Sequence, residues 1–160
     1  MRLTLHTDYA LRVLMHVGAK GDTLSTIPEI VAHFDVSRGH IMKVVHRLGQ
    51  LGYIETIRGK RGGLRLARKP AQINVGAVVR DMEEGLAVVG CLESEEPYCR
   101  IEECCVLRRA LRDATNAFLA TLDHYTLADL VKPRALARLL ALDDIARRPG
   151  ARGTPRLAAP

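Results

Sequence analysis

The feature that most constrains this chain is a pair of β-forming stretches joined by a basic, glycine-rich turn. The stretches are residues 53–57 and 64–66, and the turn between them reads Arg58-Gly59-Lys60-Arg61-Gly62-Gly63. Glycine lets the backbone reverse tightly, while β-branched and aromatic residues favour strands. The sequence therefore predicts a two-stranded β-hairpin with Arg58, Lys60 and Arg61 at its tip.

Three helices are predicted before this hairpin. Thr7 is the expected N-cap of the first, and Pro28 suits the first turn of the second, which begins near Ile27. Ser37 is a favourable N-cap for the third, which we expect from Arg38 to Leu51. Apolar residues recur at helical spacing in the first and third helices: Ala10, Val13, Leu14 and Val17, then Ile41, Val44, Val45 and Leu48.

Helix, helix, short turn, helix and basic hairpin is the order of elements in a winged helix-turn-helix. We predict a mainly α fold of this kind, with a small two-stranded wing. The start of the third helix suits the major groove of DNA, and the hairpin suits phosphates or a minor groove. The candidate DNA-binding residues are Ser37, Arg38, His40, Lys43, Arg58, Lys60 and Arg61. The alternative is a winged helix that binds another protein.

The charge distribution favours double-stranded DNA as the partner. The whole chain carries +6, but residues 1–70 hold twelve Lys and Arg against five Asp and Glu. Basic residues thus concentrate in the elements expected to contact a polyanion. No series of aromatic residues interleaves them, which argues against stacking on single strands or RNA.

The following segment predicts a dimerisation arm. Asn74 can cap a helix with Val75, Val78, Val79 and Met82 on one face, and residues 85–103 read as a loop. A long helix from near Cys105 to Leu122 follows. Its apolar residues repeat every 3.5 positions, as in a coiled-coil seam: Leu107, Leu111, Ala114, Phe118 and Leu122. We expect a homodimer, the alternative being a lone helix packed on its own domain.

Three regions are therefore expected. Residues 1–73 form the DNA-binding domain, 74–133 the dimerisation helices and cysteine-bearing loop, and 134–160 a partly disordered C-terminal extension. A short helix is predicted after Thr126, stopping at Pro133, and another at 134–145. No run of about 18 apolar residues is present, so we expect no membrane association and a cytoplasmic location.

Four cysteines, Cys91, Cys99, Cys104 and Cys105, lie in or beside the acidic loop. In a reducing compartment, clustered cysteines suggest metal or redox chemistry. The spacing alone leaves an iron–sulfur cluster, zinc and a thiol switch equally open. An enzyme with a cysteine nucleophile is disfavoured because the sequence contains no Cys–His motif that would pair the thiol with a base.

Several segments together resemble the NsrR family of nitric-oxide-sensing repressors, part of the iron–sulfur winged-helix family that includes IscR. They are MRLTLHTDYALRVLMHV, SRGHIMKVVHRL, RGKRGGLRLA, CRIEECCVLRRAL and LDHYTLADLV, and the match covers about residues 1–132. The resemblance implies a homodimer that represses transcription from operator DNA. It also implies that nitric oxide reacts with an iron–sulfur cluster and thereby lowers DNA affinity.

The resemblance implies a ligand set as well. Cys91, Cys99 and Cys105 correspond to the three cluster thiolates, with Cys104 beside them as an alternative third ligand. The TDYALR motif places Asp8 as the fourth ligand, supplied by the partner subunit; judged alone, Asp8 reads as a first-turn carboxylate. Val106, Leu107 and Arg108 follow Cys105, so the histidine of IscR-type proteins is missing. The implied cofactor is [4Fe-4S] first and [2Fe-2S] second.

Overall fold

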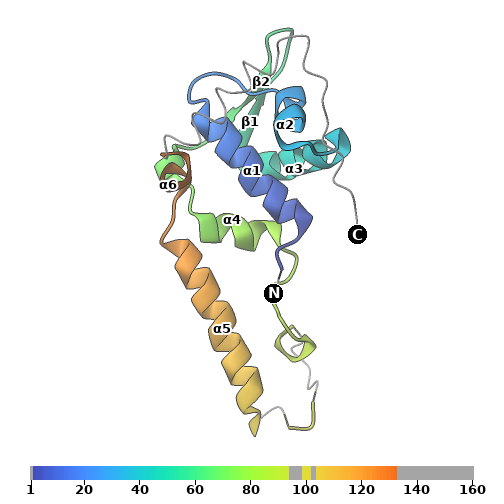
Figure 1. The fold of residues 1–160 in the computed structure, drawn as a ribbon, viewed down its shortest axis with the longest axis vertical. Coiled ribbons are helices and arrows are strands. Elements are labelled where there is room, and N and C mark those ends of the chain that lie inside the picture. Colours follow the sequence, from blue (N-terminus) through green and yellow to red (C-terminus); the bar gives the residue numbers. More distant parts are fainter. Residues whose placement is uncertain (1, 94–98, 102–103, 133–160) are drawn as a thin grey trace, which may run out of the picture.

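The computed structural model describes residues 2–93, 99–101 and 104–132 (Figure 1). A compact helical domain with a two-stranded sheet occupies one end, and a long helix extends away from it. The elements are, in order, α1 (Leu5–Ala19), α2 (Ile27–Phe34), α3 (Arg38–Gln50), β1 (Ile54–Ile57), β2 (Gly63–Leu66), η1 (Pro70–Gln72), α4 (Val75–Met82), η2 (Gly90–Leu92), α5 (Val106–Asp123) and α6 (Leu127–Val131). This order confirms the predicted winged helix-turn-helix.

The core of the compact domain is the layer between α1, α2 and α3. The predicted apolar stripes of α1 and α3 are all buried, and Ile30 of α2 closes the layer. Burying a side chain of this size contributes about 1.5–3 kcal/mol relative to leaving it exposed. The stripe thus fixes which face of α3 points outward.

The expected N-cap of α1 is wrong by one helical turn. The helix begins at Leu5, and the Thr4 hydroxyl accepts a hydrogen bond from the Thr7 amide at 3.3 Å. Thr7 itself is fully buried. The Glu83 carboxylate, 79 residues away in sequence, accepts hydrogen bonds from the Thr4 amide and hydroxyl at 2.8 and 3.2 Å. This long-range partner favours Thr4 over the equally suitable Thr7.

The hairpin has the predicted strands in antiparallel register, with Glu55 opposite Arg65. A feature absent from the sequence prediction is a bridge to a third segment. Ser25 and Leu64 exchange backbone hydrogen bonds of 3.0 and 2.7 Å, which tie the wing to the turn before α2. A Cβ on Gly63 would lie 2.7 Å from the Ser25 carbonyl oxygen, so this close backbone approach requires glycine.

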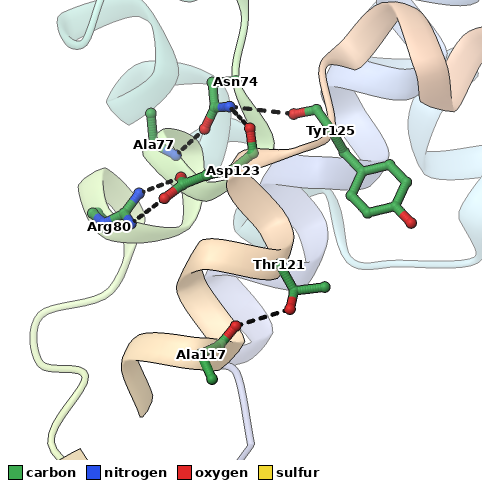
Figure 2. A network of polar contacts seen from close by, with 7 residues as sticks. All are labelled: Asn74, Ala77, Arg80, Ala117, Thr121, Asp123 and Tyr125. Atoms are coloured by element: carbon green, nitrogen blue, oxygen red, sulfur yellow. Dashed lines mark hydrogen bonds and ion pairs between the residues drawn. The ribbon is translucent and has the colours of Figure 1, made fainter. Parts of the chain in front are cut away.

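A polar joint connects α4 to the end of α5 (Figure 2). The Arg80 guanidinium donates two hydrogen bonds of 2.7 Å to the Asp123 carboxylate. Asn74 caps α4 at the Ala77 amide (2.9 Å) and donates to the Asp123 carbonyl oxygen (2.7 Å). The ion pair lowers the pKa of Asp123 and raises that of Arg80. The joint sets the direction in which α5 leaves the compact domain.

The predicted seam of α5 is largely uncovered in the single chain. Leu107 is 65% exposed and Ala114 is exposed, while Leu111, Phe118 and Leu122 are half-buried. Leu119, outside the predicted seam, is the residue of α5 that the chain itself buries. Homodimerisation through this helix therefore stays a prediction.

The predicted helix at 134–145 and the extension to residue 160 lie outside the described residues. The short helix after Thr126 is confirmed as α6. No helix in the described part of the chain is long and apolar enough to cross a membrane.

The cap of α6 generates a pH-dependent prediction. The Thr126 amide and hydroxyl donate to the Asp129 carboxylate at 2.9 and 2.6 Å, and lower its pKa from the usual 3.8 to about 2. A carboxylate whose pKa is lower in the folded protein stabilises the fold at pH values above its usual pKa. This stabilisation is lost as the pH falls through the lowered pKa. Asp129→Asn should therefore destabilise the protein at pH 6, and this difference should shrink as the pH falls from about 4 towards 2.

Urea unfolding from pH 6 to pH 3 measures this difference. Asp22→Asn, in the exposed turn after α1, is the control and should leave the free energy of unfolding almost unchanged. If the free energy of unfolding of Asp129→Asn stayed below that of the original protein by the same amount across this pH range, the proposed role of the Asp129 carboxylate would be contradicted.

Candidate nucleic-acid interface and metal centre

The N-terminal end of α3 presents the predicted base-reading residues to solvent. Ser37 caps the helix by accepting a hydrogen bond from the His40 amide at 3.3 Å, and Arg38, His40 and Lys43 are exposed. The residues on the opposite face are the buried stripe. This arrangement lets α3 enter a groove while its other side stays packed against α1.

The C-terminal half of α3 is tied to α4 instead. Arg47 donates a hydrogen bond to the Asp81 carbonyl oxygen at 3.2 Å. Tyr53 lies just before β1, and its hydroxyl donates a hydrogen bond to the Asp81 carboxylate at 2.5 Å. Burial together with this hydrogen bond raises the pKa of Tyr53. Arg47 thus positions α3, whereas Arg38, His40 and Lys43 face outward.

Residues of α1 that the sequence analysis missed lie beside this surface. A shallow hollow of about 270 Å³ is lined by residues of both helices: Leu5, His6, Tyr9, His40, Lys43 and Val44. The Tyr9 and His40 rings lie 6.0 Å apart. The clue in the sequence was the polar, aromatic start of α1, but only the packing of α1 on α3 brings it to the same face.

The tip of the wing carries the other predicted cations. Arg58, Lys60 and Arg61 are all exposed, and none forms an ion pair with any residue that the structure describes. Arg65, by contrast, pairs with Glu55 across the strands at 2.7 Å. The tip therefore offers unneutralised positive charge on a braced hairpin, as a phosphate contact requires.

The predicted thiol ligands lie on two elements and the segment between them. Cys91 is half-buried in η2, Cys99 is exposed, and Cys105 is the half-buried N-cap of α5. Within residues 2–93, 99–101 and 104–132, no three His, Cys, Asp or Glu side chains form a metal site. Cys104 is exposed, and its thiol donates a 3.4 Å hydrogen bond to the Ile101 carbonyl oxygen.

The chemistry of these donors nevertheless fits an iron–sulfur cluster. The Cys105 sulfur accepts a hydrogen bond from the Arg108 amide at 3.3 Å, and the Arg108 guanidinium donates to the Cys91 carbonyl oxygen at 3.0 Å. Arg108 thus links the backbone of one predicted ligand to the helix that begins at another. Soft thiolates, stabilised by backbone donors at a helix start, suit iron or zinc.

Asp8 lies in the first turn of α1, where its side chain contacts an arginine. Its carboxylate pairs with Arg12 at 2.9 Å and is about half exposed. The predicted role concerned the partner subunit, so the contacts of one chain leave it a prediction.

The fold and the outward basic surface define a winged helix-turn-helix transcription regulator that binds DNA. The chain belongs to the Rrf2 family, described as an iron-dependent transcriptional regulator, whose family model matches residues 3–133. This match confirms the resemblance stated from the sequence.

Within this family, the chain is similar to regulators named NsrR. The chain is 51% identical over 141 residues to the HTH-type transcriptional regulator NsrR of Geobacillus kaustophilus, which covers 88% of this chain and 96% of the relative. It is 48% identical to NsrR of Bacillus subtilis over 82% of this chain and 91% of the relative. These relatives are named as regulators, in keeping with a role other than catalysis.

Solved structures share the fold. A putative transcriptional regulator from Listeria innocua is similar with a TM-score of 0.67 and 26% identity, covering 82% of this chain and 87% of that one. The cysteine regulator CymR of B. subtilis has a TM-score of 0.65 at 22% identity, over 82% of this chain and 96% of that one. The latter supports the architecture alone.

The unpaired cations of the wing should control the salt dependence of DNA binding. Each phosphate contact adds about 0.9 to the slope of log affinity against log salt. Replacing Arg58, Lys60 and Arg61 by Ala should therefore flatten the slope by up to about 2.7 per wing. Binding to a fixed duplex is measured by fluorescence anisotropy at several salt concentrations.

The matched control is the double variant Glu55→Gln/Arg65→Gln. It removes a wing arginine that is already neutralised and leaves the net charge unchanged. Its salt slope should equal that of the original protein. An unchanged slope in the triple variant would show that the wing tip does not contact phosphates.

Proposed function

We propose that the protein is a nitric-oxide-sensing transcriptional repressor that binds operator DNA as a homodimer and loses affinity when its iron–sulfur cluster reacts. The observation that carries the proposal is that one continuous segment joins the DNA-binding domain to the predicted cluster ligands. It leaves α4 beside the recognition helix and reaches Cys91, which Arg108 links to the start of α5. Two further findings support the proposal: the similarity to regulators named NsrR, and membership of a family described as iron-dependent.

The homodimer is supported by the uncovered face of α5. Val106 and Leu107 are 68% and 65% exposed near the start of the helix, where a monomer gains nothing from apolar side chains. A second copy packed along this face would remove them from water. A two-fold dimer would also present two recognition helices to two half-sites, about one helical turn of DNA apart.

The cluster would be held by Cys91, Cys99 and Cys105, with [4Fe-4S] favoured over [2Fe-2S]. It would supply iron that nitric oxide attacks. Arg108 holds the Cys91 backbone against α5, and the amide of the same residue supports the Cys105 sulfur. Loss of the cluster would leave Cys91 joined to α5 through the Arg108 hydrogen bond, and the segment before Cys91 would be freer to move.

That segment begins at two contacts with the DNA-binding domain. Glu83 accepts hydrogen bonds from Thr4 at the start of α1. Asp81 accepts bonds from Arg47 of α3 and from Tyr53. Motion of residues 84–91 would therefore act on α1 and α3 together. A misplaced base contact costs about 1–3 kcal/mol, so a small rotation suffices to weaken specific binding.

The partner's Asp8 would be the fourth ligand in this scheme. It lies one turn beyond Thr4 on α1, the helix that Glu83 already contacts. A carboxylate ligand from α1 of the other subunit would lock both winged domains to the dimer arm. The two recognition helices would then stay at operator spacing only while the ligand is bound.

An alternative function is a winged-helix regulator that senses iron–sulfur status or redox state through a cluster, zinc or a thiol switch. The observation that favours it is Cys104, an exposed thiol directly beside Cys105. Metal analysis distinguishes the two: zinc, or no metal with a reversible disulfide, supports the alternative.

The absorbance spectrum of anaerobically purified protein tests the proposal. We expect a broad band near about 400 nm, typical of thiolate-bound clusters, that bleaches as nitric oxide is added. Cys91→Ser, Cys99→Ser and Cys105→Ser should each lose the band and the bound iron. Cys104→Ser is the matched control and should keep both.

Two results would change this assignment. If Cys105→Ser kept the absorbance band and the bound iron while Cys104→Ser lost them, Cys104 would be the third ligand in place of Cys105. A protein that stays colourless after cluster reconstitution would contradict cluster-based sensing while leaving DNA binding intact.

Asp8→Ala tests the coupling between subunits. The variant should release iron faster and bind operator DNA more weakly, because its winged domains lose their link to the arm. Asp22→Ala removes an exposed carboxylate elsewhere in the same domain and should match the original protein in both assays. Unchanged iron retention and operator affinity in Asp8→Ala would refute the coupling.

A further inference from the structure

The helix α3 exposes a large apolar side chain, Met42. Successive residues of a helix are rotated by about 100°, so Met42 lies at about 100° from the buried Ile41 and about 160° from the buried Val44 around the helix axis. Met42 is 50% exposed, although its exposed neighbours on the helix are polar or small. Among the described residues, Met42 is not one of those packed against the hydrophobic core.

A glycine lies next to it on the same face. Gly39 is one turn before Met42, and the two positions are neighbours on the helix surface. A Cβ on Gly39 would meet no atom within 4 Å, and its φ is ordinary for a helix. The fold itself therefore does not require glycine here, and alanine would favour the helix.

Together these residues place bare helix backbone beside an exposed apolar side chain, and we call this patch the Gly39–Met42 notch. Arg38 borders it on the preceding turn, and Lys43 and His46 border it on the other side, all exposed. The missing side chain lets another molecule approach the helix backbone, and the cations around it favour an anionic one. A base edge between two phosphate backbones has this combination of properties.

We propose that the Gly39–Met42 notch receives the 5-methyl group of a thymine in the major groove, and that Met42 is a specificity-determining residue of the operator-binding surface. The inference rests on the proposed DNA-binding function and adds the base that it reads. Thymine is the base that presents a methyl group in that groove. The flexible, polarizable methionine side chain adapts readily to such a group.

Deoxyuridine substitution tests the contact, because it removes the methyl and leaves base pairing unchanged. The operator is first obtained by selecting from randomised duplexes with anaerobically purified full-length protein. Each thymine is then replaced singly by deoxyuridine, and affinities are measured. One thymine per half-site should be sensitive, and its replacement should weaken binding about fourfold, the value of one buried methyl-sized group.

Met42→Gln and the deoxyuridine substitution together form a double-mutant cycle across the contact. Glutamine is chosen because its length and helix propensity are similar to those of methionine. On the thymine duplex this variant should lose about the same factor as a duplex in which the sensitive thymine of both half-sites is replaced by deoxyuridine, because the variant changes both subunits. On that doubly substituted duplex Met42→Gln should weaken binding no further, because both changes remove the same contacts. Independent, multiplying losses would overturn the proposal.

Gly39→Ala provides a readout that a purely structural role would not give. The added methyl should raise Tm by roughly 2 °C while weakening operator binding, since it fills the notch. Gly49→Ala is the matched control. It is the second residue from the other end of the same helix, is exposed, and its Cβ would lie at an ordinary 3.8 Å from the Ile54 carbonyl oxygen. It should raise Tm similarly and leave the affinity unchanged.

The outcomes separate this inference from the function on which it rests. If the selected operator binds tightly but tolerates deoxyuridine at every thymine, the notch reads no methyl, and DNA binding stands. If no sequence is enriched and binding to duplex DNA is lost at moderate salt, both ideas are overturned.

Discussion

An exposed ion pair helps to set the direction in which α5 leaves the compact domain, and the position of Cys105 at the far end of α5 depends on that direction. Arg80 and Asp123 meet in a bidentate geometry, with Asn74 bonded to the backbone of the same turn (Figure 2). Exposed ion pairs contribute little to the free energy of unfolding. The main effect of the Arg80–Asp123 pair is on geometry, because two parallel hydrogen bonds fix an angle as well as a distance. Gly76 is part of the same constraint, since a Cβ there would collide with the Asp123 carboxylate.

The recognition helix faces two requirements that divide its surface. Its buried stripe must hold it against α1 and α2, and its outer face must stay available for DNA. The structure resolves this by anchoring the C-terminal half through Arg47 and leaving the first two turns without such a tie. The first two turns are also where Gly39 and Met42 lie. The core contacts and the binding surface thus occupy different faces of α3, and the polar tie through Arg47 lies at its C-terminal end.

Local patterns predicted most of the fold, because helices and hairpins are specified by residues close in sequence. Ser37 and Asn74 were found as caps for that reason, and so was the two-stranded wing. Thr7 was misassigned as a cap because its rival, Thr4, is chosen by Glu83 from far along the chain. Tyr9 escaped notice as a surface residue because only packing places it beside His40. The thiols could be recognised as ligands by type, but spacing alone cannot specify the metal they bind.

The same long-range contacts that defeat sequence prediction are the ones that can carry a signal. Glu83 and Asp81 are adjacent to the loop that leads to Cys91, yet their partners, Thr4, Arg47 and Tyr53, belong to the DNA-binding domain. A regulator whose sensor and reader were separate lobes would need a rigid interface to couple them. In this protein the end of α4 both begins the loop that leads to Cys91 and supports α3. Under the proposed function, a change in this loop would need no long relay, because it would act directly on a support of the recognition helix.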